Sequence, residues 1–118
     1  MITRESIEEK FDVLIRQLKK CGGEVYIDST KKLENDIFSN DDKVRETALK
    51  QVASRSNFLN TRVWDDLGVG PGVENQLYPT YYKDSFVDDF NNFSEFYEFL
   101  KGLVKDVEEY YKVKNYTI

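Results

Sequence analysis

The sequence predicts a mostly α-helical single domain, a bundle of about four to five helices with a small β element. Three observations predict this class: the chain has 118 residues, strong helical periods lie near both ends, and a single Gly/Pro cluster lies between them. A chain of this length usually forms one domain with one core, so residues 1–118 are expected to fold together. The cluster at residues 68–72 is expected to join an N-terminal helical lobe to a C-terminal aromatic and acidic lobe.

The first expected element is a helix that begins near Ser6 and ends before the glycine pair at residues 22–23. Ser6 and Glu9 match the S-x-x-E capping box, and Thr3 offers a second N-cap one turn earlier. The glycine pair supplies a residue that accepts the left-handed conformation at which many helices end. An apolar stripe at spacings of three and four residues indicates the buried face: Ile7, Phe11, Leu14, Leu18 and Cys21.

Residues 24–28 predict a short strand, because Val25 and Ile27 alternate with polar or amphipathic neighbours. A lone strand cannot satisfy its backbone hydrogen bonds, so it needs a partner. Residues 77–82 are the candidate partner, and Pro79 confines that segment to the edge of a sheet.

Three short helices are expected next, each with a polar cap followed by apolar residues at helical spacing. The caps lie at residues 28–30, 40–42 and 56–57. The apolar residues that follow them are Leu33 and Ile37, then Val44, Ala48, Leu49 and Val52, then Phe58, Leu59, Val63 and Leu67.

The strongest helical period lies near the C-terminus and consists mainly of aromatic residues. These residues recur every three or four positions: Phe86, Phe90, Phe93, Tyr97, Leu100, Val104, Val107 and Tyr111. We expect a turn near residues 85–91 and a long helix from about 93 to 112. Its apolar face is wider than a coiled-coil seam and favours burial inside a bundle.

Charge and aromatic residues are unevenly distributed along the chain. Residues 1–63 carry twelve basic and eleven acidic side chains, whereas residues 64–118 carry five basic and eleven acidic ones. Thirteen aromatic residues lie in the second segment and four in the first. An acidic surface repels the phosphates of nucleic acid, so a nucleic-acid partner is disfavoured. The same surface attracts and steers a basic protein.

Composition excludes several kinds of catalytic and metal site. The chain has no histidine, so its single thiol, Cys21, lacks the usual general base and is expected in the core. One cysteine allows neither an intrachain disulfide nor a thiolate zinc site. The paired carboxylates are adjacent in sequence and do not face each other across a cleft, as a glycosidase requires. We therefore predict a protein that is not an enzyme and has no metal site or cofactor.

The sequence also predicts the cellular compartment of the protein. No apolar run is long enough to cross a membrane, and the charged N-terminus lacks an apolar signal-peptide region. The sequence therefore predicts a cytoplasmic protein without a membrane partner.

The candidate partner-binding surface follows the glycine loop. It consists of Tyr78, Tyr81, Tyr82, Asp84, Asp88 and Asp89. Three tyrosines around one proline are hard to bury together, and tyrosine is over-represented where binding energy concentrates. The sequence predicts a non-enzymatic acidic module that inhibits or regulates a basic protein, such as a toxin or a nuclease. In physical type, but in no motif, it resembles immunity proteins, antitoxins and phage-encoded inhibitors.

Residues 51–67 support an alternative, a helical DNA-binding or transcription-linked protein. Their length and texture are similar to a helix-turn-helix, whose second helix would carry Thr61 and Arg62 into the major groove. Asp65 and Asp66 would then approach phosphates, and two packed helices joined by a polar turn explain the pattern better. The side of the middle helices that carries three arginines is the second candidate surface: Arg45, Arg55 and Arg62.

Overall fold

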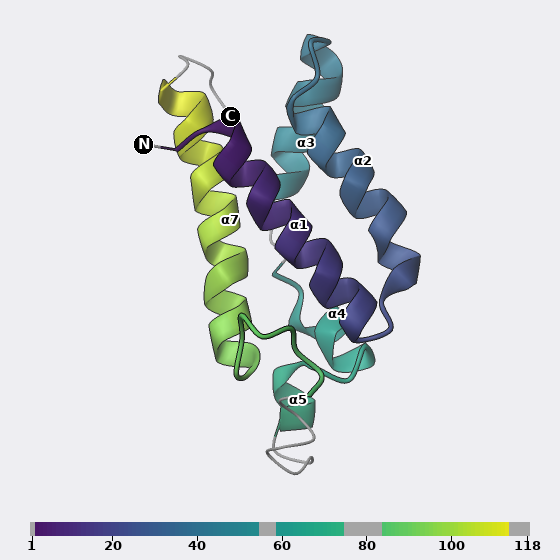
Figure 1. The fold of residues 1–118 in the computed structure, drawn as a ribbon. Coiled ribbons are helices and arrows are strands. Elements are labelled where there is room, and N and C mark those ends of the chain that lie inside the picture. The colour runs from purple at the N-terminus through teal and green to yellow at the C-terminus, as the bar shows by residue number, and fades with distance from the viewer. Residues whose placement is uncertain (1, 55–58, 75–83, 114–118) are drawn as a thin grey trace.

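The computed structural model describes residues 2–54, 59–74 and 84–113. The described helical elements, in chain order, are α1 (Arg4–Lys20), η1 (Glu24–Tyr26), α2 (Ile27–Ile37), α3 (Asp42–Ala53), α4 (Thr61–Asp66), α5 (Pro71–Glu74) and α7 (Phe93–Val113) (Figure 1). The mostly helical prediction is therefore confirmed.

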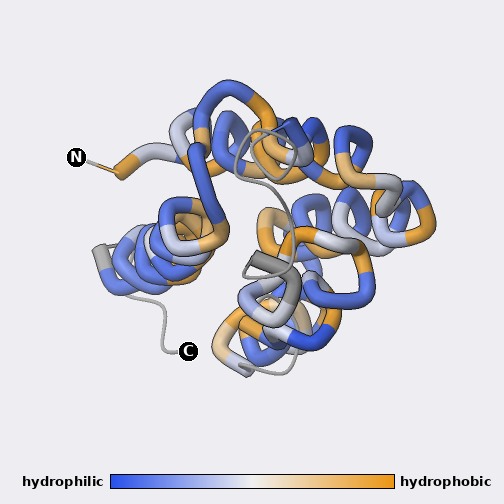
Figure 2. Tube along the Cα trace, turned by 90° about the horizontal axis from the view of Figure 1, so that it is seen from below, coloured by the Kyte–Doolittle hydropathy of each residue, from blue (hydrophilic) through white to orange (hydrophobic). Residues whose placement is uncertain are grey.

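The four longest helices form a closed ring around one core. Helix α1 contacts α2 and α7. Helix α3, across the ring from α1, contacts the same two helices. The short helices α4 and α5 contact each other at one end of this ring, where α5 also contacts α7 (Figure 1). Seen from that end, most hydrophobic stretches of the chain face the space between the helices (Figure 2).

Helix α1 agrees with the predicted stripe, and its N-cap is Thr3 rather than Ser6. The Ser6 N–H donates to Oγ1 of Thr3 at 3.1 Å, and the Thr3 N–H donates to Oγ of Ser6 at 3.0 Å. This reciprocal pair satisfies two backbone donors at the helix start. At the other end Gly22 adopts a φ of 82°, and the N–H of Gly23 donates to the carbonyl of Leu18 at 2.7 Å. The glycine pair therefore ends the helix, as expected.

The predicted strand at residues 24–28 is wrong, and the described residues contain no strand. Glu24–Tyr26 forms the single 3-10 turn η1, and α2 begins at once with Ile27. The buried positions of α2 follow a helical period: Ile27, Thr30, Leu33 and Ile37. That period runs over eleven residues and outweighs a two-residue alternation. Val25 remains 80% exposed. The proposed partner strand, residues 77–82, lies outside the described residues.

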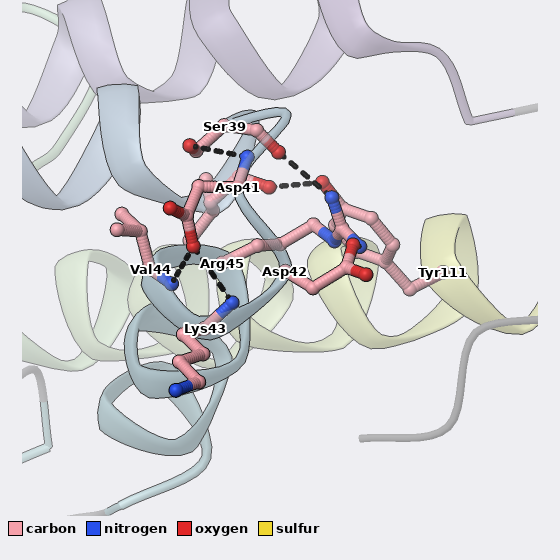
Figure 3. A network of polar contacts seen from close by, with 8 residues as sticks. Ser39, Asp41, Asp42, Lys43, Val44, Arg45 and Tyr111 are labelled. Carbon is pink, nitrogen blue, oxygen red and sulfur yellow. Dashed lines mark hydrogen bonds and ion pairs between the residues drawn. The ribbon is translucent and has the colours of Figure 1, made fainter.

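The caps of the middle helices agree with the prediction at α3 and differ at α2. Asp41 caps α3, where its carboxylate accepts the backbone N–H groups of Lys43 at 2.9 Å and Val44 at 3.1 Å (Figure 3). Helix α2 starts before its predicted cap at 28–30. The hydroxyls of Ser29 and Thr30 instead donate to the Tyr26 carbonyl behind them.

Helix α4 begins later than the predicted cap at residues 56–57. Its N-cap is Asn60, whose side-chain oxygen accepts the N–H of Arg62 at 3.0 Å. Residues 55–58 lie outside the described part of the chain.

The glycine cluster folds tightly back onto α4. Gly68 has a φ of 80°, which favours glycine. The Asp65 carboxylate accepts the N–H of Gly72 at 2.8 Å, and a Cβ on Gly70 would lie 2.2 Å from Oδ1 of Asp65. A side chain at residue 70 therefore has no room, and the turn between α4 and α5 depends on this close approach.

Helix α7 spans Phe93–Val113 and agrees with the helix expected over about 93 to 112. Within this helix, the ring of Phe96 is fully buried. It packs edge to face against the Trp64 ring of α4, with the ring centroids 4.6 Å apart. Other rings of the same cluster belong to Phe90, at 5.2 Å, and Phe86, at 6.2 Å. Geometries of this kind add to the burial of aromatic area. One residue of α7 thus joins three parts of the chain.

Leu100→Ala is expected to destabilise the protein strongly. Leu100 is 0% exposed in the middle of α7, so truncation leaves a cavity in the shared core. We expect a loss of about 2–5 kcal/mol in the free energy of unfolding, measured by urea denaturation. A loss below about 0.5 kcal/mol, the range of ordinary surface substitutions, would contradict the packing.

Val25→Ser is expected to be nearly neutral, in contrast to a core strand position. The side chain is 80% exposed and has little burial to lose. The free energy of unfolding should change by less than about 0.5 kcal/mol. The matched control is Val52→Ser in α3, which replaces a buried valine and should be clearly destabilising. Equal effects of the two changes would argue for a buried Val25.

Candidate functional site

The three predicted aspartates lie on residues 84–92, the non-helical segment that precedes α7. Asp84, Asp88 and Asp89 are all exposed. The three predicted tyrosines, at positions 78, 81 and 82, lie outside the described residues. The structure therefore describes the acidic half of the predicted surface, on one continuous stretch of chain.

A buried glutamine of α1 holds this segment in place. Gln17 is 0% exposed, and its side-chain N–H donates to the backbone carbonyl of Ser85 at 2.9 Å. The N–H of Val87 donates back to the side-chain oxygen of Gln17 at 2.9 Å. The two bonds lie on either side of Phe86 in the sequence, so one amide fixes three consecutive residues. Gln17 is not among the predicted site residues, and it lies inside the apolar stripe between Leu14 and Leu18.

Two buried aromatic residues anchor the segment as well. Phe86 and Phe90 both pack in the core, and the Phe90 ring lies 5.2 Å from the ring of Phe99. Asp88 and Asp89 lie between these anchors in the sequence and are exposed. Burial of the phenylalanines and exposure of the aspartates thus alternate along a short stretch.

The three aspartates differ in their partners. An oxygen of Asp89 lies 3.7 Å from the guanidinium of Arg16 on α1, and both side chains are about half exposed. Within the part of the chain that the structure describes, Asp84 and Asp88 make neither an ion pair nor a hydrogen bond through their carboxylates. An exposed pair such as that of Asp89 adds little stability. The carboxylates of Asp84 and Asp88 are therefore exposed to solvent with no partner among the described residues.

The end of the segment is fixed by the cap of α7. The side-chain oxygen of Asn92 accepts the N–H of Glu95 at 3.0 Å. The Glu95 carboxylate accepts the backbone N–H of Asn91 at 3.0 Å in return. The Glu95 carboxylate thus binds the residue before the N-cap rather than the N-cap itself, and the two bonds give the segment a defined direction where it enters the helix.

One arginine of the second candidate surface, Arg45, is committed to structure. The Arg45 guanidinium donates to the carbonyl of Ser39 at 2.8 Å and pairs with Asp42 (Figure 3). The hydroxyl of Tyr111, from α7, donates to the carbonyl of Ile37 beside this turn. The Arg45 side chain is only 17% exposed and fastens the α2–α3 turn. Arg55 lies outside the described residues.

The helix-turn-helix interpretation places its second helix at α4. That helix has six residues, fewer than two turns, and Trp64 within it is buried against α7. Thr61 and Arg62 are exposed. Asp65 directs its carboxylate to the turn at Gly72. Of the three arginines on this side, Arg62 is the one that the structure describes as exposed.

The single thiol lies at the end of α1 and packs partly buried against the core. Burial raises the pKa of the Cys21 thiol above its ordinary value. A raised pKa lowers the thiolate fraction near neutral pH, so this cysteine is a weak nucleophile. Among the described residues, no three His, Cys, Asp or Glu side chains gather into a group that could hold a metal ion. No helix in those residues is long and apolar enough to cross a membrane.

Glu34 of α2 is influenced by the charges of acidic side chains on α1. Burial raises the pKa of the Glu34 carboxyl, and the charges of Asp12 and Glu8 on α1 raise it further. The charge of Arg4 acts in the opposite direction. The folded protein therefore binds a proton at Glu34 more tightly than the unfolded chain does.

Glu34→Gln is expected to increase stability at pH 7 by up to about 1 kcal/mol, because it removes an ionised carboxylate from an acidic surrounding. Stability of the parent should fall as the pH rises from the ordinary glutamate pKa through the raised pKa of Glu34. The gain should therefore vanish near pH 4. Urea denaturation at both pH values measures it, with the exposed Glu9→Gln of α1 as control. A less stable Glu34→Gln protein at pH 7 would contradict the assignment.

Comparison with known proteins gives no relative: no protein family matches the chain, and neither does any characterised protein or solved structure. The functional proposal therefore rests on the residues of this chain.

Proposed function

We propose that the chain is a non-enzymatic protein-binding module whose acidic surface inhibits or regulates a basic protein partner in the cytoplasm. One observation carries this proposal. The segment at residues 84–92 is held by Gln17, Phe86 and Phe90 while its aspartates are exposed. Binding residues are often found on irregular segments that a rigid scaffold positions.

The charge of the chain favours the same class of partner. Residues 64–118 carry eleven acidic side chains against five basic ones. A surface of this sign attracts a basic protein and raises the rate of association. It also opposes binding to DNA or RNA, whose phosphates need lysine and arginine.

The mode of inhibition follows from this charge. A nuclease or a nucleic-acid-binding toxin presents lysine and arginine side chains to phosphates. Asp84 and Asp88 would pair with such side chains, because a carboxylate and a guanidinium form strong, charge-assisted hydrogen bonds. The tyrosines at positions 78, 81 and 82, which the sequence predicts as binding residues, would add aromatic contacts. Such contacts commonly carry much of the binding energy. The partner then loses its access to nucleic acid.

The first experiment identifies the partner and measures its binding kinetics. The protein is used to capture partners from a native lysate, and a captured basic protein is then purified for kinetic measurement. The double change Asp84→Lys with Asp88→Lys should slow association by about tenfold or more at low salt and flatten its salt dependence. Tyr81→Ala should speed dissociation instead.

The double change Glu108→Lys with Glu109→Lys is the matched control for this charge reversal. It makes the same change in net charge near the C-terminal end of α7, where Glu109 is exposed and lies about 24 Å along the helix from Phe93. That distance exceeds the Debye length of about 8 Å at physiological salt, so association measured at that salt concentration should change less than it does for the double aspartate variant. Equal association rates for both sets of variants and the parent, with all of them folded, would contradict the proposed surface.

Binding to mixed-sequence duplex DNA is the outcome that favours the alternative function. It should be absent for the proposed module at low salt. Strong, salt-dependent DNA binding that Arg62→Ala abolishes would instead support a DNA-binding protein.

A further inference from the structure

Packing of the core does not by itself require a polar side chain at Gln17. Its neighbours in the apolar stripe are Leu14 and Leu18, and all three residues are buried. An apolar side chain of similar size would continue the stripe. The amide is needed because the carbonyl of Ser85 and the N–H of Val87 point at this position. Without it, both of these part-buried backbone groups would lose this partner, which is unfavourable.

The bonds of Gln17 lie next to Asp84 and Asp88, whose carboxylates have no partner among the residues that the structure describes. Asp84 directly precedes the held residues 85–87, and Asp88 directly follows them. One neutral amide therefore fixes the backbone between both carboxylates. Asp89, by contrast, faces Arg16 of the same helix. Two neighbouring residues of α1 thus contact the segment: Gln17 through its buried amide and Arg16 through its exposed guanidinium.

We propose that Gln17 is a positioning residue that holds Asp84 and Asp88 in the conformation that receives two cationic side chains of a basic partner. This inference rests on the proposed function and adds the group that organises its surface. A segment fixed before binding loses less conformational entropy on association. Gln17 itself does not touch the partner, because it is fully buried.

The experiment uses a hexa-arginine peptide as the probe and follows backbone amide signals by NMR. In the parent protein the shifts on titration should concentrate at residues 84–88. Gln17→Met keeps the size of the side chain and removes both bonds. It should weaken peptide binding at this segment by at least about threefold, because the segment is no longer organised in advance. Exchange of the Val87 amide should accelerate by about tenfold or more.

Ile7→Val is the matched control. It removes a methyl group from a fully buried residue of the same helix, near the other end of α1. It should lower the overall stability without changing peptide binding or the relative exchange of the Val87 amide. A general loss of stability would instead affect both variants alike.

The outcomes separate the two proposals. Parent shifts that avoid residues 84–88 would contradict the proposed function. Parent binding at residues 84–88, with equal binding by a folded Gln17→Met protein, would overturn the positioning role and leave the proposed function standing. If Gln17→Met does not fold, the parent protein still provides a test. A Val87 amide that exchanges as fast as an exposed one would overturn the inference.

Discussion

The packing around the ring of Phe96 is the interaction on which the rest of the structure depends. This ring is fully buried and contacts Trp64 of α4 and both Phe86 and Phe90 of the segment at residues 84–92. Helix α4 has only six residues, and residues 84–92 are not helical. Both depend on these contacts for their order, because such short segments are not stable without tertiary packing. The aromatic residues thus extend the core beyond the four long helices and fix the surface that carries the aspartates.

The long helices were predictable because their apolar residues repeat over several turns. The stripes of α1 and α7 each cover more than four turns, so one misplaced residue does not hide the period. Residues 24–28 gave only two alternating apolar positions, which a strand and a helix start share. Burial decided between them: Ile27 belongs to the core face of α2, and Val25 has no core to face. That distinction depends on tertiary packing, which a five-residue window does not contain.

The candidate site was predictable in part. Their charge and their position after the glycine loop predict Asp84, Asp88 and Asp89 as site residues, and the structure describes all three as exposed. The group that holds them was missed because Gln17 is separated from the segment by about seventy residues of chain. One local signal was present: a polar residue stands within an otherwise apolar stripe. Such a residue needs a hydrogen-bonding partner when it is buried, and the partner is often a segment without regular structure.

The choice of an amide rather than a charge has a consequence for binding. A neutral, buried hydrogen bond keeps its strength when salt is added, whereas the half-exposed contact between Arg16 and Asp89 is screened. The backbone between Asp84 and Asp88 therefore keeps its conformation over a wide range of ionic strength. The attraction that we propose between these carboxylates and a basic partner would weaken with added salt, because both carboxylates are exposed. Salt dependence of binding would thus report the charges of the surface and not the loss of its structure, so positioning and attraction can be measured separately.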